Sequence, residues 1–376
     1  MKRNCLTFAL TVLLMLCITG CQNAATSEEQ ENSSSQIQSE EAPSAETIKD
    51  YGPATKGALP GDGERPIKTD SNSEYEFEVF SAGTVITSYI GDREVTELTI
   101  PEELGGKPVV KLGTLSMENI DQMECVILPD SLLEIGTHAF SSCDSLSEIQ
   151  FSSNLKTIGE MAFWYCKSLQ YPVLPDSLET IRNGAFDHSG VVELIIPEQV
   201  NEMGTSICSS CYALEYAEFL NHPDRVPESM FNLCESLLNV EGLDHVTVVD
   251  KQAFFGCEAL NGIELPEGLE RIEESAFSCC TALDDLLLPS TLRYIGDSAF
   301  FANGFYTVTI PAGVETVDEF AFNYNSNLES VTIEGASTVI KQGAFSRNHL
   351  TVCYMPSTTS FDELAFDEGT EMVYRD

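Results

Sequence analysis

The sequence predicts a right-handed α/β solenoid of about 12 coils, and three observations predict it. An Ala-Phe pair, or a substitute for it, recurs at intervals of 21 to 24 residues. The frame L-x-x-I-G-x-x-A-F-x-x-C-x-x-L-x-x-I-x-L-P surrounds these pairs. Finally, a single coil of roughly 23 residues cannot bury so many apolar side chains alone, and stacking on its neighbours solves that problem.

The aromatic position of the frame predicts a spine through the stack. Its marks are Met117, Phe140, Phe163, Phe186, Ile207, Phe231, Phe254, Phe277, Phe300, Phe322, Phe345 and Phe366. We expect each of the ten Phe rings to lie on the ring of the next coil. Met117 and Ile207 fill the same position in two coils where Phe is missing.

The second half of the frame predicts a strand. In L-x-x-I-x-L the last two apolar residues are two apart, so both point to one face. Proline then removes a backbone donor and ends the ladder. We expect these strands to form a parallel sheet on the concave face, about 4.8 Å apart. Gly after Ile relaxes the backbone for a turn into a short helical segment at each Ala-Phe position.

The period and the L-x-x-L-x-L signature are typical of leucine-rich repeats. The stretches "LPDSLLEIGTHAFSSCDSLSEIQF" and "TIPEELGGKPVVKLG" resemble the BspA-like leucine-rich repeat proteins found on many anaerobic bacteria. The resemblance covers nearly all of residues 74–376. It implies a solenoid fold and a role at the cell surface, most often in adhesion.

The chain divides into three parts. Residues 1–20 resemble a lipoprotein signal peptide, because Lys2 and Arg3 precede an apolar run that ends "ITGC", which predicts a lipid on Cys21. A simple secretory signal or an uncleaved anchor is the alternative. Residues 21–73 are acidic and Ser-rich and predict a disordered tether. Residues 74–376 form the repeat domain, with a β-hairpin cap and first strand in 74–116.

The cysteines predict structure rather than chemistry. The position three after each Phe holds Cys143, Cys166, Cys234, Cys257 and Cys280, so the vicinal pair at 279–280 is one repeat residue beside a variable neighbour. "CSSC" at 208–211 lacks the βαβ context of a redox motif. We interpret it as part of a repeat with an extra residue, in which Cys211 is displaced. Mostly free thiols are expected.

Composition excludes several functions. No His-Glu-x-x-His, Gly-x-Ser-x-Gly, Walker or Gly-x-Gly-x-x-Gly motif occurs, so we predict no enzyme and no cofactor. The formal net charge of −41 disfavours nucleic acid and favours basic partners or divalent cations.

The outward strand positions supply the candidate binding site, since neither outward column contains Lys or Arg. The candidate residues are Tyr171, Glu193, Tyr216, Glu218, Glu241, Glu264 and Asp285. No firm metal site follows, but three of them (Glu218, Glu241, Glu264) share one column in consecutive coils. A calcium ion or a basic protein segment could hold such a column, and splaying of the side chains into water is the plain alternative.

These observations predict a lipid-anchored protein on the extracellular side of a bacterial membrane. Its solenoid would bind a protein or another macromolecule, in an adhesin-like or scaffolding role. One alternative is a structural envelope protein without a specific ligand. Another is a glycan-binding surface lipoprotein, for which Trp164 is the only indole and a poor platform.

Overall fold

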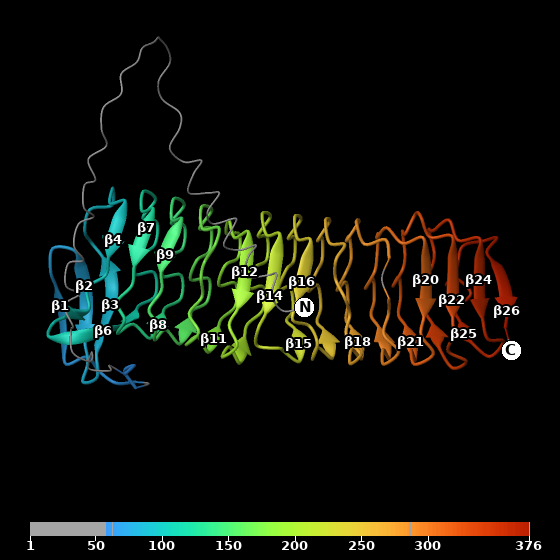
Figure 1. The fold of residues 1–376 in the computed structure, drawn as a ribbon, viewed down its shortest axis with the longest axis horizontal. Helices are drawn as coiled ribbons and strands as arrows, with labels where there is room; N and C mark the ends of the chain where they lie inside the picture. Colours follow the sequence, from blue (N-terminus) through green and yellow to red (C-terminus); the bar gives the residue numbers. More distant parts are fainter. Residues whose placement is uncertain (1–57, 62, 286, 376) are drawn as a thin grey trace, which may run out of the picture. The chain divides into compact units, whose positions relative to one another are not determined.

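The fold is a β-solenoid, here described from a computed structural model in which residues 58–61, 63–285 and 287–375 are placed. It has about 13 turns with repeats of roughly 23 residues, close to the predicted number. The predicted signal peptide, Cys21 and most of the predicted tether lie outside the described residues. Successive coils stack from β1 to β26 along the solenoid (Figure 1).

Two ladders of parallel strands line the stack, where the frame predicted one sheet. The first ladder comes from the L-x-x-I-x-L half of the frame and forms the upper row in Figure 1. Its strands are β4 (Glu97–Thr99), β7 (Cys125–Ile127), β9 (Glu148–Gln150), β12 (Glu193–Ile196), β14 (Tyr216–Phe219), β16 (Asn239–Glu241), β20 (Thr307–Ile310), β22 (Ser330–Ile333), β24 (Val352–Met355) and β26 (Glu371–Tyr374).

The second ladder comes from the L-x-x-I part of the frame and forms the lower row in Figure 1. Its strands are β6 (Lys107–Leu112), β8 (Glu134–Ile135), β10 (Thr157–Ile158), β11 (Thr180–Ile181), β13 (Glu202–Met203), β15 (Arg225–Val226), β17 (Val248–Val249), β18 (Arg271–Ile272), β19 (Tyr294–Ile295), β21 (Thr316–Val317), β23 (Val339–Ile340) and β25 (Ser360–Phe361). Gly follows several of these strands, and neighbouring coils approach each other closely there. A Cβ on Gly159 would lie 2.6 Å from the Gly136 carbonyl carbon of the preceding coil.

A β-hairpin covers the first coil, as the alternating sequence predicts. Strands β2 (Tyr75–Val79) and β3 (Thr84–Tyr89) pair antiparallel, and β3 pairs parallel with β6. The short β5 (Glu103–Leu104) folds back on β6. One prediction is wrong here. Strand β1 (Lys68–Ser71) lies in the range assigned to the tether, yet it pairs with β2, because an edge strand needs backbone partners rather than apolar side chains.

The Ala-Phe segments are stacked turns, and the predicted helical segments are absent from the described chain. Alternate amides of each turn donate hydrogen bonds to different coils. Phe140 N–H donates to Ala162 O of the next coil at 2.8 Å, whereas Ala139 N–H closes a turn on Gly136 O at 3.2 Å. His138, two residues before Phe140, has a φ of 53°. A helix needs every amide bonded four residues back and negative φ throughout, so this alternation excludes one.

The Phe rings of the turns stack on one another along the solenoid. Eight consecutive pairs have centroids 5.0 to 5.5 Å apart and planes within 22° of parallel. The rings run in two blocks, from Phe140 to Phe186 and from Phe231 to Phe366. From Phe140 to Phe345 each of these side chains is almost completely buried, and the terminal Phe366 is partly covered.

The interruption of the spine corrects the expected register at 207–211. Phe186 N–H donates to Ile207 O, as Phe163 N–H does to Ala185 O, so Ile207 occupies the Ala position. Cys208 then occupies the Phe position, and Cys211 lies three residues later, in the regular position and without an extra residue. The small Cys208 leaves space that Phe219 helps to fill, since its ring packs edge-on against Phe231 at 6.1 Å.

The repeat cysteines bind backbone carbonyls. Cys166 Sγ donates to Phe140 O of the preceding coil at 3.1 Å, and Asn325 Nδ2 makes the equivalent bond to Phe300 O at 2.9 Å. All ten cysteines that the structure describes are free. Burial raises the pKa of the Cys143 thiol to about 12, so this side chain is a neutral donor at physiological pH.

The spine leads to a stability prediction. Phe277→Ala removes a buried ring that stacks on Phe254 and Phe300, so we expect the free energy of unfolding to fall by about 3–5 kcal/mol. Urea titration followed by circular dichroism measures the loss. The exposed His349→Ala is the matched control and should leave the midpoint unchanged. Equal midpoints for the two variants would show that the ring does not hold the stack together.

Candidate functional site

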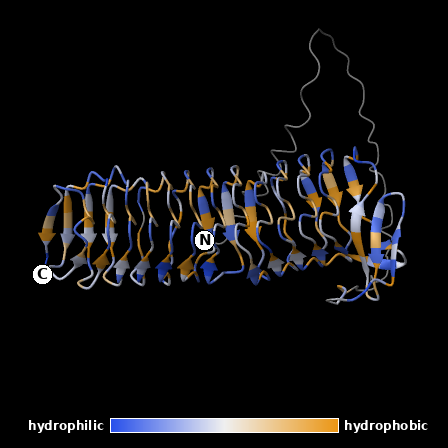
Figure 2. Cartoon of the chain, turned by 180° about the vertical axis from the view of Figure 1, so that it is seen from behind, coloured by the Kyte–Doolittle hydropathy of each residue, from blue (hydrophilic) through white to orange (hydrophobic). Residues whose placement is uncertain are grey.

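The outward side chains of the first ladder form one surface, which we call the first-ladder face. Strand pairing fixes its columns, because Glu193 lies opposite Tyr216, and Ile195 opposite Glu218. Glu218 in turn lies opposite Glu241. Polar and apolar residues both occur along these strands (Figure 2). Four predicted site residues, Glu193, Tyr216, Glu218 and Glu241, therefore do share three adjacent strands, β12, β14 and β16.

Tyr171 lies at an interruption of this ladder. Residues 170–174, all described, contain no strand, because Pro172 takes the inward position and removes a ladder donor. The neighbouring side chains turn outward, so that Tyr171 is 50% exposed and Val173 is 82% exposed. Together with Ile195 on β12 they form an exposed apolar patch beside the acidic residues.

Glu264 and Asp285 lie at a second interruption, between β16 and β20. Here the paired column of carboxylates ends at Glu241, since neither of these residues belongs to a strand. Both instead line a shallow cavity of about 500 Å³ together with Leu287, which is 86% exposed. Glu264 is thus in the expected column by sequence but is not paired with Glu241.

The paired carboxylates repel one another. Partial burial raises the pKa of Glu218, and the charge of Glu241 raises it further, while a hydrogen bond from Tyr216 opposes the shift. The folded protein therefore binds this proton more tightly than the unfolded chain, so stability is lost as the pH rises from the unfolded-state pKa of Glu218 through its raised folded-state pKa. Among the described residues, no group of three or more acidic, His or Cys side chains is arranged to hold a metal ion. The geometry gives the calcium hypothesis no support.

A row of aromatic rings on the turn side was missed by the sequence analysis. His138 meets Trp164 edge-on at 6.1 Å, and Trp164 meets Tyr165 at 4.4 Å. Tyr165 stacks on His188 at 4.8 Å, and His188 meets Tyr212 at 6.5 Å. Trp164 is therefore not isolated. The signal was present in the sequence as His, Trp and Tyr residues within four positions of the spine in consecutive coils.

Comparison with known proteins agrees with this architecture. Residues 110–238 and 247–372 match the BspA type leucine rich repeat region, in six copies. No curated protein matches the chain. The described chain holds no helix that could cross a bilayer.

Two solved structures share the fold, and a third is similar over most of its length. The pneumococcal vaccine antigen PcpA is 16% identical, with a TM-score of 0.54 over 82% of this chain and 99% of that one. A leucine-rich repeat protein from Bacteroides ovatus is 18% identical, with a TM-score of 0.50 over 82% and 100%. A leucine-rich cell surface protein from Faecalibacterium prausnitzii is 20% identical, with a TM-score of 0.42 over 78% and 95%.

The family match, the 23-residue period and the stacked coils agree with one another. The chain resembles bacterial leucine-rich repeat proteins in its repeats and in its fold. Because the match spans more than half of the sequence, the chain belongs to the BspA-type leucine-rich repeat family of non-enzymatic repeat proteins.

Proposed function

We propose that this protein is a lipid-anchored bacterial surface protein whose first-ladder face binds a macromolecular partner. The observation that carries the proposal is the patch formed by Tyr171, Val173 and Ile195 beside the carboxylates of Glu193 and Glu218. Exposed apolar and tyrosine side chains gain most from being covered by another protein. The paired strands β12 and β14 hold Ile195, Glu193 and Glu218 in place, so little backbone entropy is lost there on binding.

Charge indicates the kind of partner. The two outward columns contain no Lys or Arg, and Glu218 and Glu241 face each other on adjacent strands. A basic side chain placed between these two carboxylates would remove their repulsion and lower the pKa of Glu218 again. A protein with Lys or Arg around an apolar centre therefore complements this face, whereas nucleic acid does not.

The first test addresses the apolar patch. We expect Tyr171→Ser combined with Val173→Ser to weaken binding by about tenfold or more, because the patch loses its anchoring side chains. Purified full-length protein would be tested by biolayer interferometry against a panel of extracellular matrix proteins and, separately, against cell-wall material.

Val339→Ser is the matched control, since Val339 is an exposed aliphatic residue on the second ladder. The control should bind as the wild type does. If the double variant and the control bind equally well, the first-ladder face is not the binding surface. If no panel member binds, the structural envelope role is favoured instead.

The second test addresses the anchor, which lies outside the described residues. Cys21→Ser removes the thiol that would carry the lipid, so the protein should leave the membrane fraction or remain unprocessed. Metabolic labelling with a radioactive fatty acid and cell fractionation measure this. Cys17→Ser, four residues earlier in the apolar run, is the control and should label normally. Undiminished labelling of Cys21→Ser would contradict lipidation at this residue.

A glycan-binding role is the second candidate, and the aromatic row favours it. Sugars pack their C–H faces on aromatic rings, and the row from His138 to Tyr212 offers five rings in four successive coils. If this candidate holds, Trp164→Ala abolishes binding on a glycan array. Tyr324→Ala, which removes another exposed ring of the turns, leaves binding intact. Unchanged glycan binding by Trp164→Ala would exclude the row as the site.

A further inference from the structure

The second ladder is broken at one place, between β13 and β15. These are the second-ladder strands of two successive coils, yet they belong to different sheets. Pro223 occupies the position that holds Leu or Val in most coils, and Pro227 the position that often holds Gly. Gly204 N–H donates to Ile181 O at 2.8 Å, and Pro227 has no N–H with which to make the next bond of this series.

The break leaves backbone groups without their usual partners. In the preceding coils Lys156 O accepts bonds from Glu179 N–H and Thr180 N–H, at 2.9 and 3.0 Å. The corresponding bonds from residues 224 and 225 to Asn201 O are absent between these described segments. Donors thus remain on the β15 side and acceptors on the β13 side.

The coil between β13 and β15 is open only at the second ladder. The first ladder continues, with Leu220 N–H bonded to Ile196 O at 2.9 Å. The turns also continue, with Cys208 N–H bonded to Met230 O at 3.0 Å. Asn221 partly bridges the gap through a bond from Nδ2 to Val200 O at 3.0 Å, while its Oδ1 is buried without a partner. The opening therefore belongs to one coil, and the hydrogen bonds of the first ladder and of the turns hold it in shape.

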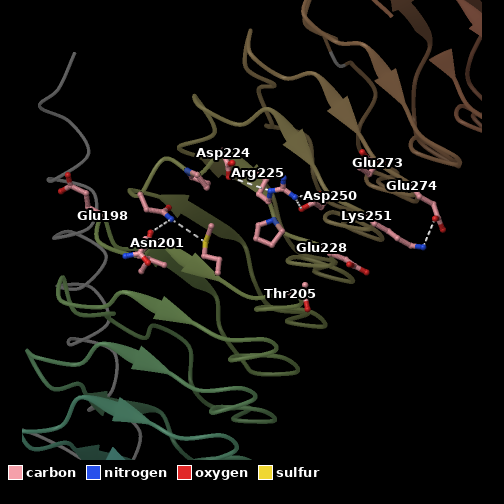
Figure 3. A pocket seen from close by; sticks show the side chains of 15 residues that line it. Glu198, Asn201, Thr205, Asp224, Arg225, Glu228, Asp250, Lys251, Glu273 and Glu274 are labelled. Atoms are coloured by element: carbon pink, nitrogen blue, oxygen red, sulfur yellow. Dashed lines mark hydrogen bonds and ion pairs between the residues drawn. The ribbon is translucent and has the colours of Figure 1, made fainter. Parts of the chain in front are cut away.

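A cleft of about 860 Å³ lies at this opening, within the size range of ligand sites. Its apolar lining comes from Val200, Met203, Pro223 and Pro227. Figure 3 shows charged side chains around the opening. The acidic ones are Glu198, Asp224, Glu228, Asp250, Glu273 and Glu274.

The two basic side chains of the cleft are already occupied. Arg225 lies 3.2 Å from Asp250, and Lys251 lies 2.8 Å from Glu274 (Figure 3). Burial raises the pKa of Asp250 in spite of Arg225, and the charges of Glu273 and Glu228 add to that shift. The cleft thus has more negative charge than its own cations balance.

We propose that this cleft binds an extended, basic peptide segment of a partner protein, which pairs its backbone with the open edges of β13 and β15. An extended peptide supplies donors and acceptors along both sides, as in strand addition to a sheet edge. Its Lys or Arg side chains would reach Glu228 and Glu273, and its apolar side chains would cover Met203. This site lies on the second ladder and does not depend on the first-ladder face.

The test uses a fluorescent nonapeptide of alternating Lys and Val, with fluorescence anisotropy of the purified full-length protein as the readout. A second peptide carries N-methyl groups on alternate residues and has the same charge, but it cannot donate backbone hydrogen bonds at those positions. We expect the wild-type protein to bind the N-methylated peptide more weakly than the unmethylated one, by about tenfold. Equal affinity for the two peptides overturns the proposal and leaves only attraction to an acidic surface.

Two variants locate the site. Glu228→Gln with Glu273→Gln should weaken binding of the Lys-Val peptide about tenfold, whereas the exposed pair Glu319→Gln with Glu363→Gln, outside the cleft, should change it little. Pro227→Gly restores the donor that Gly204 provides one coil earlier, so it should close the ladder, keep or raise the melting temperature and weaken binding. Unchanged binding by both cleft variants would place the peptide elsewhere and overturn the proposal.

Discussion

Backbone hydrogen bonding between successive coils is the constraint on which the rest of this structure depends. Most coils contribute amides to the coil beside them at the first ladder, at the second ladder and at the Ala-Phe turns. Neighbouring backbones are then held at about the spacing of parallel strands, roughly 4.8 Å. Side chains at equivalent positions must stack, which is why the spine rings lie nearly parallel and the repeat cysteines all reach the preceding carbonyl.

The same constraint makes each proline at a ladder position a sign of a local break in the stack. A proline at a ladder position removes one bond between two particular coils, and the other sides of the coil hold the stack together. Pro172 does this on the first ladder and exposes Tyr171 and Val173, while Pro227 does it on the second ladder and opens a cleft. Surface that differs from coil to coil therefore arises where the repeat is violated, and both proposed interaction sites lie at such places.

Much of the fold could be predicted because every column is repeated many times. The period, the strands before proline, the N-terminal hairpin and the positions of the spine all follow from local patterns. The Ala-Phe turns could not be distinguished from short helices, since their alternate amides bond to another coil some 23 residues away. The place of Cys208 in the spine was not predicted, because the aromatic residue that identifies this position is missing there. The position becomes clear only from the hydrogen bond of Phe186 N–H to Ile207 O.

The column to which each candidate site residue belongs could be predicted, but the exposure of its side chain could not. Sequence places Glu218, Glu241 and Glu264 in one column, yet Glu264 is not paired with Glu241 because the chain forms no strand there. Trp164 was predicted to be a poor platform because it is the only indole, whereas its ring partners are His138 of the preceding coil and the adjacent Tyr165. Acidic charge is spread over the whole solenoid, so charge alone marks no site. A broken ladder adds exposed apolar side chains or unpaired backbone groups beside this charge. Only at such places do the acidic residues form part of a surface that fits a particular partner.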